Sequence, residues 1–356
     1  MRFDAGRFFG RAWLALAVAA GLVSPAAAQA VQGSGSTFAQ PIISTWARDF
    51  LRDRADGNDF VANEGGIDYE PVGSLAGILR LSQPEVDFAA SDAPLPPEEV
   101  EKRGLAQFPI VLGGLAAVAN LDGLRAGELR LDGVVLAEIY LGRITRWNDP
   151  AIARINPELQ LPDQPISVVH RSDGSGSTLT WTRFLSASSQ EWREKLGADT
   201  LIDWPTGIAA KGSSGVIEAI RNTRGAIGYV EFGQVVRAGL AYAQIRNRAG
   251  SFVTPSPESF AATASAADWD PAKDFYVHLT DVDAADAYPL AAATFVLMHR
   301  RERSAARTRR TLAFLSFALD KGAPTAAALG YVPLPDDLVA KVKDHWRAAL
   351  PGAAEY

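Results

Sequence analysis

One local design recurs along this chain and constrains its fold more than any other feature. It consists of a short apolar run, a loop rich in Gly, Ser and Thr, and then apolar residues at helical spacing. The clearest copy covers residues 166–185 and has Arg171 at the end of the apolar run, and related arrangements cover residues 33–50 and 67–81. Strands that alternate with helices in this way predict an α/β fold with mostly parallel sheets flanked by helices.

A loop of this kind is suited to binding an anion. The first-turn N–H groups of a helix have no partner within the helix and point outward with the positive end of the helix dipole. Residues 174–178 supply N–H and hydroxyl donors, and Arg171 supplies a planar fork that fits a tetrahedral oxyanion. Short motifs also match by chance, so these residues alone leave an ordinary surface turn as an open alternative.

Residues 1–28 have the pattern of a cleavable secretory signal peptide. Arg2, Arg7 and Arg11 form a basic start, residues 12–23 are apolar, and small residues then offer cleavage after Ala28 or Ala30. A membrane anchor is less favoured, because the apolar run is shorter than the roughly 20 residues that a spanning helix needs. We therefore expect an exported chain.

Cysteine is absent from all 356 residues. This excludes disulfides, thiolate metal sites and a lipid anchor attached to cysteine. The length suits about two domains, which can build a core without covalent staples. Together with the signal peptide, these features predict a periplasmic protein that is not lipid-anchored, and we expect a monomer.

The charge balance constrains the ligand. The formal net charge is −6, and residues 1–28 account for three arginines and one aspartate, so the remainder is more acidic still. Nucleic-acid binding needs a basic field, and we expect none. The field of the whole protein also opposes an anionic ligand, so local dipoles and Arg171 would have to supply the attraction.

The sequence contains no recognisable catalytic arrangement. Its histidines are scattered without metal-ligand spacing, at His170, His278, His299 and His345. The G-x-S-x-G elbow of serine hydrolases is absent. His170 precedes Arg171 in a predicted strand, so their side chains point to opposite faces and both cannot face the loop. We expect no enzyme, no metal and no cofactor.

Six stretches resemble the phosphate-binding protein of the phosphate-specific ABC transporter, the PstS family. They are G-S-G-S-T-F-A-Q-P at 33–41, V-D-F-A-A-S-D-A-P-L at 86–95, A-E-I-Y-L-G-R-I-T-R-W-N-D-P-A-I at 137–152, H-R-S-D-G-S-G-S-T at 170–178, G-A-I-G-Y-V-E at 225–231, and the stretch from A-D-W to Y-P-L-A-A-A-T-F at 267–295. The similarity covers nearly all of the chain after the signal peptide, in order.

This resemblance implies a two-lobed periplasmic binding protein of the type II kind, with its ligand in the cleft between the lobes. Lobe I would combine residues 31–110 and 286–356, and lobe II would comprise residues 111–285. The chain would cross between the lobes near residues 108–113 and 284–289. Its implied function is to bind inorganic phosphate with high affinity and deliver it to the membrane permease subunits of an ABC importer.

The resemblance also implies which residues hold phosphate. They are Thr37, Phe38, Ser74, Asp92, Arg171, Ser175, Gly176 and Ser177, with Asp173 as the partner that orients Arg171. From spacing alone, Asp92 would instead be an ordinary turn aspartate. This chain departs from the family at Ser177, where threonine is usual, and at Leu75 and Ala76, which replace smaller residues. Leu75 adds bulk at the cleft mouth, so we expect an effect on affinity or closure.

Asp92 makes chemical sense in such a site, because phosphate near neutral pH still carries a proton that a carboxylate can accept. Fully ionised sulfate has none, and would leave the carboxylate facing a like charge. The alternatives are a secreted phosphatase, a binding protein for arsenate or sulfate, and a scavenger that docks no permease. Asp92 disfavours sulfate, but arsenate is protonated like phosphate and stays open.

Overall fold

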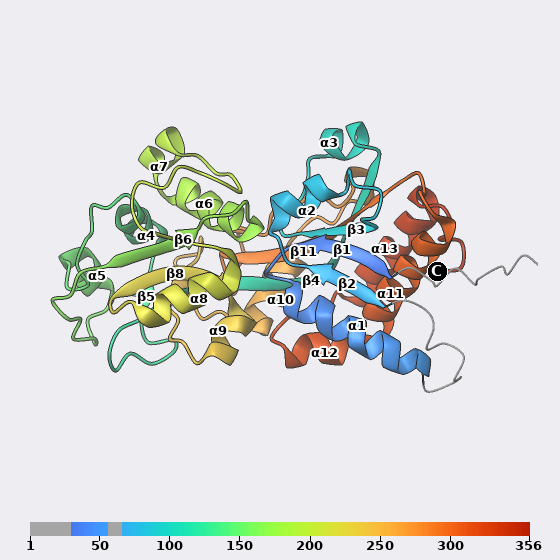
Figure 1. Cartoon of the computed structure of the whole chain (residues 1–356). Coiled ribbons are helices and arrows are strands. Elements are labelled where there is room, and N and C mark those ends of the chain that lie inside the picture. The colour runs from blue at the N-terminus through green and yellow to red at the C-terminus, as the bar shows by residue number, and fades with distance from the viewer. Residues whose placement is uncertain (1–29, 56–65) are drawn as a thin grey trace, which may run out of the picture.

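The computed structural model describes residues 30–55 and 66–356 (Figure 1). The predicted signal peptide at residues 1–28 lies outside the described residues. Within the described ranges, every helix is too short or too polar to cross a membrane.

The described strands and helices alternate along most of the chain, as the sequence predicts. The strands are β1 (Val31–Gly35), β2 (Ile67–Glu70), β3 (Phe88–Ser91), β4 (Leu105–Ala119), β5 (Arg130–Leu131), β6 (Ser167–Arg171), β7 (Ile208–Ala210), β8 (Ala226–Glu231), β9 (Gln244–Arg246), β10 (Phe252–Val253) and β11 (Ala291–His299). The helices are α1 (Gln40–Ala55), α2 (Ser74–Arg80), α3 (Pro97–Lys102), α4 (Gly133–Tyr140), α5 (Pro150–Ile155), α6 (Gly176–Ser188), α7 (Gln190–Lys195), α8 (Gly212–Asn222), α9 (Phe232–Ala238), α10 (Pro257–Ser265), α11 (Ala305–Lys321), α12 (Ala323–Ala328) and α13 (Asp336–Ala349), with a 3₁₀ turn η2 at Pro271–Lys273.

Eight of these strands form one continuous sheet, in the order β2-β1-β3-β11-β4-β8-β6-β7. Pairing is parallel at both flanks, in β2-β1-β3 and in β8-β6-β7. The sheet is mostly parallel, as expected, and the exceptions lie in its middle, where β11 and β4 run antiparallel to their neighbours. These two strands connect the two lobes seen in Figure 1, and the two-lobed α/β class expected from the sequence is confirmed.

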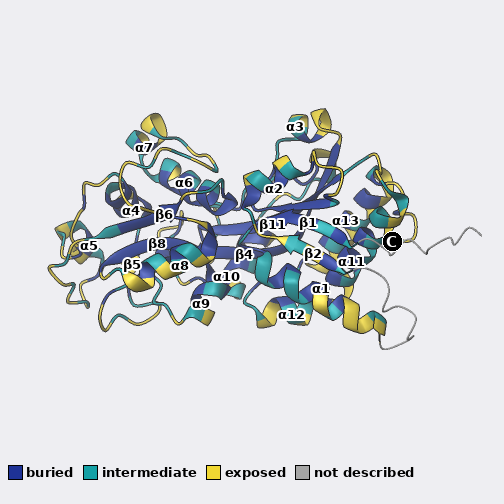
Figure 2. Ribbon diagram, in the orientation of Figure 1, coloured by how far each residue is buried: buried dark blue, intermediate teal, exposed yellow. Residues whose placement is uncertain are grey.

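Strand β4 is the main connection between the lobes, and all 15 of its residues are buried (Figure 2). It pairs with β11 as far as Gly114 and with β8 from Leu115 onward. Two glycines stand at this exchange because a Cβ on Gly113 would lie 2.9 Å from Phe38 Cζ, and one on Gly114 would lie 2.3 Å from Phe260 Cε1. Aromatic rings therefore pack directly on the backbone at the crossing.

The contacts of Asp274 differ from the predicted lobe boundaries. Asp274 lies within the range predicted for lobe II, but its carboxylate accepts hydrogen bonds from Gln107 N at 3.4 Å and Arg300 Nη2 at 2.9 Å. Both partners belong to the range predicted for lobe I. We propose that β4 crosses between the lobes at residues 113–115, and that the loop around Asp274 moves with lobe I.

Candidate functional site

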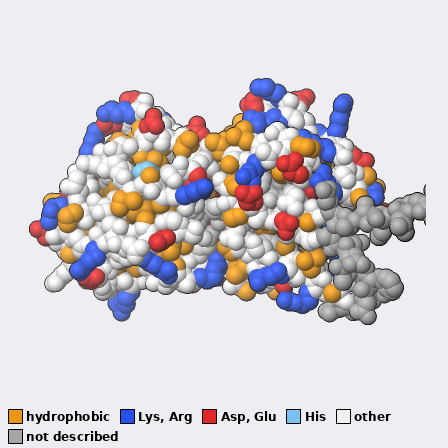
Figure 3. Space-filling model, in the orientation of Figure 1, with side chains coloured by type: hydrophobic (Ala, Val, Ile, Leu, Met, Phe, Trp, Pro, Cys, Tyr) orange, Lys and Arg blue, Asp and Glu red, His pale blue; other side chains and the backbone are white. Residues whose placement is uncertain are grey.

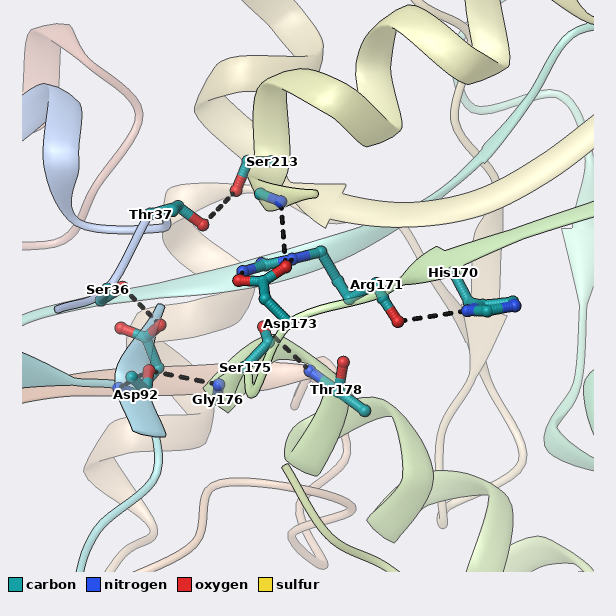
Figure 4. Close-up of polar contacts among 12 residues, drawn as sticks. Ser36, Thr37, Asp92, His170, Arg171, Asp173, Ser175, Gly176, Thr178 and Ser213 are labelled. Carbon is teal, nitrogen blue, oxygen red and sulfur yellow. Dashed lines mark hydrogen bonds and ion pairs between the residues drawn. The ribbon is translucent and has the colours of Figure 1, made fainter. Parts of the chain in front are cut away.

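The carboxyl ends of β1, β3 and β6 meet between the lobes (Figure 4), and Gly/Ser loops of the sequence follow β1 and β6. Ligands in open α/β sheets bind at this end of the strands. Thr37 follows β1, Asp92 follows β3 directly, and Arg171 is the last residue of β6. The structure thus brings three distant parts of the predicted site together.

Thr37 and Phe38 lie just before α1. The Thr37 hydroxyl is 3.0 Å from the Ser213 hydroxyl at the start of α8, which joins lobe I to lobe II. The Phe38 ring is buried and packs edge-on against Tyr331, with centroids 5.9 Å apart. Phe38 can therefore serve a ligand only through its backbone N–H.

Arg171 is buried and forms an ion pair with two hydrogen bonds to the half-buried Asp173. Arg171 Nε donates to Asp173 Oδ1 at 2.7 Å, and Nη2 donates to Oδ2. Asp173 Oδ1 also accepts from the Gly212 amide at 2.9 Å. Burial alone would raise the pKa of Asp173, but the bonds from Arg171 and Gly212 outweigh it and the pKa lies below its ordinary value. This pairing fixes the plane of the guanidinium group.

Ser74, at the start of α2, links the two lobes. Its hydroxyl oxygen accepts from the backbone N–H of Asp92 and from that of Gly176, both at 3.2 Å. Gly176 is packed so tightly that a Cβ there would lie 2.7 Å from Asp92 Cβ. With its oxygen accepting two bonds, Ser74 has its hydroxyl proton left to donate.

Ser175 and Ser177 flank the first residue of α6. Ser175 is the N-cap, and its hydroxyl accepts from the Thr178 amide at 3.4 Å while its own amide donates to the Thr200 carbonyl at 2.8 Å. Ser177 is buried in the first turn. The N-terminal end of α6, with its positive dipole end, therefore points toward Ser74 and Asp92.

Asp92 is the buried carboxylate of the site. Ser36 Oγ donates to its Oδ2 at 2.5 Å, and Thr294 Oγ1 donates to its Oδ1 at 2.7 Å. Burial raises the pKa of Asp92 to about 6, against the opposing effects of these two hydroxyls and of Arg171. At pH 7 Asp92 is therefore mostly ionised and accepts hydrogen bonds.

His170 faces away from the loop, as the strand alternation predicts (Figure 4). Its ring stacks on Trp204 with centroids 4.8 Å apart, and Nδ1 lies 3.1 Å from the Arg171 carbonyl oxygen. Burial lowers its pKa. No group of three or more metal-binding side chains gathers anywhere in residues 30–55 and 66–356.

Four polar residues at this site were missed by the sequence reasoning: Ser36, Ser213, Gln234 and Thr294. Ser36 stands within the G-S-G-S-T loop, and Thr294 within the A-A-A-T-F stretch that carries the family resemblance. Both residues stand in motifs that pointed to the site. That they contact Asp92, however, follows from the order of the strands in the sheet, which these motifs do not specify. Ser213 stands in a Gly/Ser loop at residues 212–215 that opens α8, so it had the same kind of local signal, whereas Gln234 had none beyond its place in the first turn of α9.

The comparisons with known proteins agree with this geometry. A family model described as a PBP superfamily domain matches residues 22–321, and the chain belongs to that superfamily. It is 42% identical to the phosphate-binding protein PstS of Xylella fastidiosa strain Temecula1, covering 89% of this chain and 84% of that protein. It is 39% identical to PstS of Pasteurella multocida, covering 91% of each. Within the superfamily, the chain belongs to the PstS family.

Solved structures support the fold. A high-affinity periplasmic phosphate-binding protein (PfluDING) with bound phosphate aligns with a TM-score of 0.67 at 22% identity, covering 92% of this chain and 97% of that one. A phosphate-binding protein of Stenotrophomonas maltophilia aligns with a TM-score of 0.64 at 21% identity, covering 90% and 94%. These structures confirm the fold, and the PstS relatives confirm the family resemblance expected from the sequence.

Proposed function

We propose that this protein binds one inorganic phosphate ion between its lobes, using Thr37, Phe38, Ser74, Asp92, Arg171, Ser175, Gly176 and Ser177. The observation that carries the proposal is a buried carboxylate, Asp92, placed among donors that suit an oxyanion. Arg171 is paired with Asp173, so the site is not strongly positive, and backbone N–H groups and hydroxyls supply most of the attraction. This suits a protein of net charge −6.

The buried carboxylate selects phosphate over sulfate by requiring a proton on the ligand. Phosphate at neutral pH offers a P–OH group to ionised Asp92. Sulfate offers none, so the ionised carboxylate would face a like charge with no proton between them. Sites built to hydrogen-bond a ligand OH reject analogues without it by roughly 10⁴-fold.

Delivery to an ABC importer follows from the relatives, which carry the PstS name at 38–42% identity over most of this chain. The protein would act in the periplasm, close its lobes on phosphate and present the closed form to the permease subunits. The ligand would be held and released unchanged, and no cofactor is required. Hinge closure around a ligand is an established motion of two-lobed folds.

Calorimetric titration of the phosphate-stripped protein at pH 7.5 tests the proposal. We expect one phosphate bound per chain and no measurable sulfate heat. Binding of neither anion would contradict the function, and equal binding of both would contradict the role of Asp92.

A second experiment addresses the selection mechanism. Asp92→Asn replaces one carboxylate oxygen by an NH₂ donor, which can face a fully ionised oxygen. We expect weaker phosphate binding and detectable sulfate binding in this variant. If Asp92→Asn still rejects sulfate as the parent does, selection by the ligand proton is wrong. The Asp68→Asn variant serves as control, because Asp68 is exposed on β2 away from the site.

A further inference from the structure

Two buried hydroxyls hold Asp92 from opposite sides. Strand β3 lies between β1 and β11 in the sheet. Ser36 comes from the loop after β1 and donates to Oδ2, while Thr294 comes from β11 and donates to Oδ1 (Figure 4 shows the Ser36 bond). Neither hydroxyl-bearing residue has any exposed surface. The register that pairs Phe295 with Ser91 brings Thr294 next to Asp92.

We propose that Ser36 and Thr294 are specificity-determining residues, which hold Asp92 as an ionised acceptor and so set the pH range in which the site rejects fully ionised oxyanions. The inference rests on the proposed function and deepens it. Ser36 and Thr294 act through Asp92, so they are positioning residues and need not touch the ligand.

The direction of the Ser36 hydrogen bond is fixed by a second contact. The Ala39 amide donates to Ser36 Oγ at 3.1 Å, so the hydroxyl's proton is directed to Asp92. A donor stabilises the ionised form of a carboxylate relative to its neutral form. Both hydroxyls therefore oppose the effect of burial, which favours protonation of Asp92.

Few other ionisable groups act on Asp92. Arg171 on β6 favours its ionised form. Tyr69 on β2 and Tyr331 also feel its charge, but burial raises the pKa of both phenols well above 10, so they stay neutral. Tyr69 donates instead to the Ser36 carbonyl oxygen at 2.9 Å. With Arg171 already paired to Asp173, the two hydroxyls are the contacts that single substitutions can remove.

Ser36, Asp92 and Thr294 all lie within lobe I. The two hydroxyls therefore hold the Asp92 carboxylate in place before the lobes close. If one hydroxyl is removed, Asp92 takes up a proton at higher pH. A protonated Asp92 is a donor, and it can then face an oxyanion that has no proton. The variants should therefore admit sulfate at pH values where the parent excludes it.

The experiment is calorimetric titration with sulfate and with phosphate, from pH 5 to 8.5, for the parent and for Thr294→Val and Ser36→Ala. One hydrogen bond to a charged group corresponds to a shift of about one pH unit. We expect the pH midpoint of sulfate rejection to rise by about that amount in each variant, and further in the double variant. At pH 7, sulfate affinity should rise about tenfold relative to phosphate affinity.

Two controls separate specificity from structure. Thr294→Ser keeps the hydroxyl and should keep the parent's midpoint. Ser91→Ala removes an equally buried hydroxyl one residue before Asp92, whose proton goes to the Ala93 carbonyl oxygen at 2.7 Å, and it should not move the midpoint. If one hydroxyl variant fails to fold, the other still gives the test.

The outcomes distinguish the two proposals. A parent that binds no phosphate overturns the proposed function and this inference with it. A parent that selects phosphate, with variants that lose affinity for both anions equally and keep the same midpoint, overturns the inference alone. A raised midpoint, restored in Thr294→Ser, supports it.

Discussion

The side-chain amide of Gln234, in α9, donates to the backbone carbonyl oxygen of Thr37 at 3.1 Å. Gln234 belongs to the lobe that follows the β4 crossing, whereas Thr37 belongs to the first lobe and to the proposed phosphate site. The same amide lies 3.4 Å from the Phe38 carbonyl oxygen. This contact therefore joins the lobes at the loop whose N–H groups are proposed to face the phosphate.

Gln234→Ala should weaken phosphate binding by roughly tenfold, because a hydrogen bond that exists only between closed lobes is lost. The loss should lie in a faster dissociation rate, since the open form is unchanged. Stopped-flow release of phosphate to a fluorescent acceptor measures it. Gln244→Ala is the matched control, because its amide donates at 2.7 Å to Gly127, away from the site. A slower association rate with unchanged release would contradict this assignment.

Arg171→Lys should reduce phosphate affinity by about 100-fold although charge is conserved. Lysine cannot form the two-bond fork with Asp173, and so cannot be held in one plane. Hydrogen bonds between charged groups contribute about 1.5–3 kcal/mol each. Calorimetry gives the affinity, and Arg146→Lys, at an exposed pair with Asp163, is the control. An affinity within threefold of the parent would show that only the charge matters.

Glu231 predicts a pH dependence of stability. It is buried at the N-terminal end of α9, where its carboxylate accepts from the amides of Gly233 at 2.5 Å and Gln234 at 2.9 Å. Burial raises its pKa from 4.5 to about 7, despite those bonds and Arg237. The folded state thus binds the proton more tightly than the unfolded state, so its contribution is full below pH 4.5 and is lost as pH rises through 7.

Glu231→Gln removes the ionisable group, so the free energy of unfolding should fall less between pH 4.5 and 8 than in the parent. Between pH 4.5 and 8, the free energy of unfolding should fall by at most about 3 kcal/mol more in the parent than in Glu231→Gln. Urea denaturation across that range measures it. The pKa of Asp92 is also raised by burial, so stability still falls with rising pH to some extent in the Glu231→Gln variant. The exposed Glu218→Gln is the control, and equal slopes for all three proteins would refute the prediction.

Contacts of this site between residues close in the sequence can be predicted from the sequence, and contacts between distant residues cannot. Arg171 and Asp173 are two residues apart, so their pairing could be anticipated from one motif. The start of α11 at its N-cap Ser304 and its end before Gly322 are local in the same way, because a serine before a helical run and a glycine after it specify the two ends. Thr294, by contrast, is 202 residues from Asp92. Its contact exists only because β11 runs antiparallel beside β3, which no local pattern specifies.

The antiparallel centre of the sheet shows the same limit. The apolar run at residues 108–120 predicts a buried crossing strand, and β4 is that strand. Alternation of strands and helices, however, favours mostly parallel pairing and does not specify which strands are the antiparallel exceptions. The chain must cross between lobes and return, and a returning strand beside the first runs antiparallel to it. That requirement comes from the two-lobed arrangement as a whole.

Leu75 and Gly174 form the contact at the cleft mouth, where hydrophobic side chains lie over α2 beside the notch between the lobes (Figure 3). The Leu75 amide donates to the Gly174 carbonyl oxygen at 3.2 Å. A Cβ on Gly174 would lie 2.5 Å from Leu75 Cβ and 2.7 Å from its Cδ2. The bulk of Leu75 is therefore accommodated because residue 174 has no side chain.

Gly174→Ala should hold the lobes apart and lower phosphate affinity by about tenfold or more, since overpacking a tight contact costs about 1–3 kcal/mol. Adding Leu75→Gly to the Gly174→Ala chain removes the clashing atoms and should restore most of the phosphate affinity. In a double-mutant cycle, the double variant should then lose less binding free energy than the sum of the losses of the two single variants. Gly215→Ala, where the nearest atom to a new Cβ is 3.7 Å away, controls for the added methyl group. Additive effects of Gly174→Ala and Leu75→Gly would mean that the two residues do not meet in the closed, ligand-bound form.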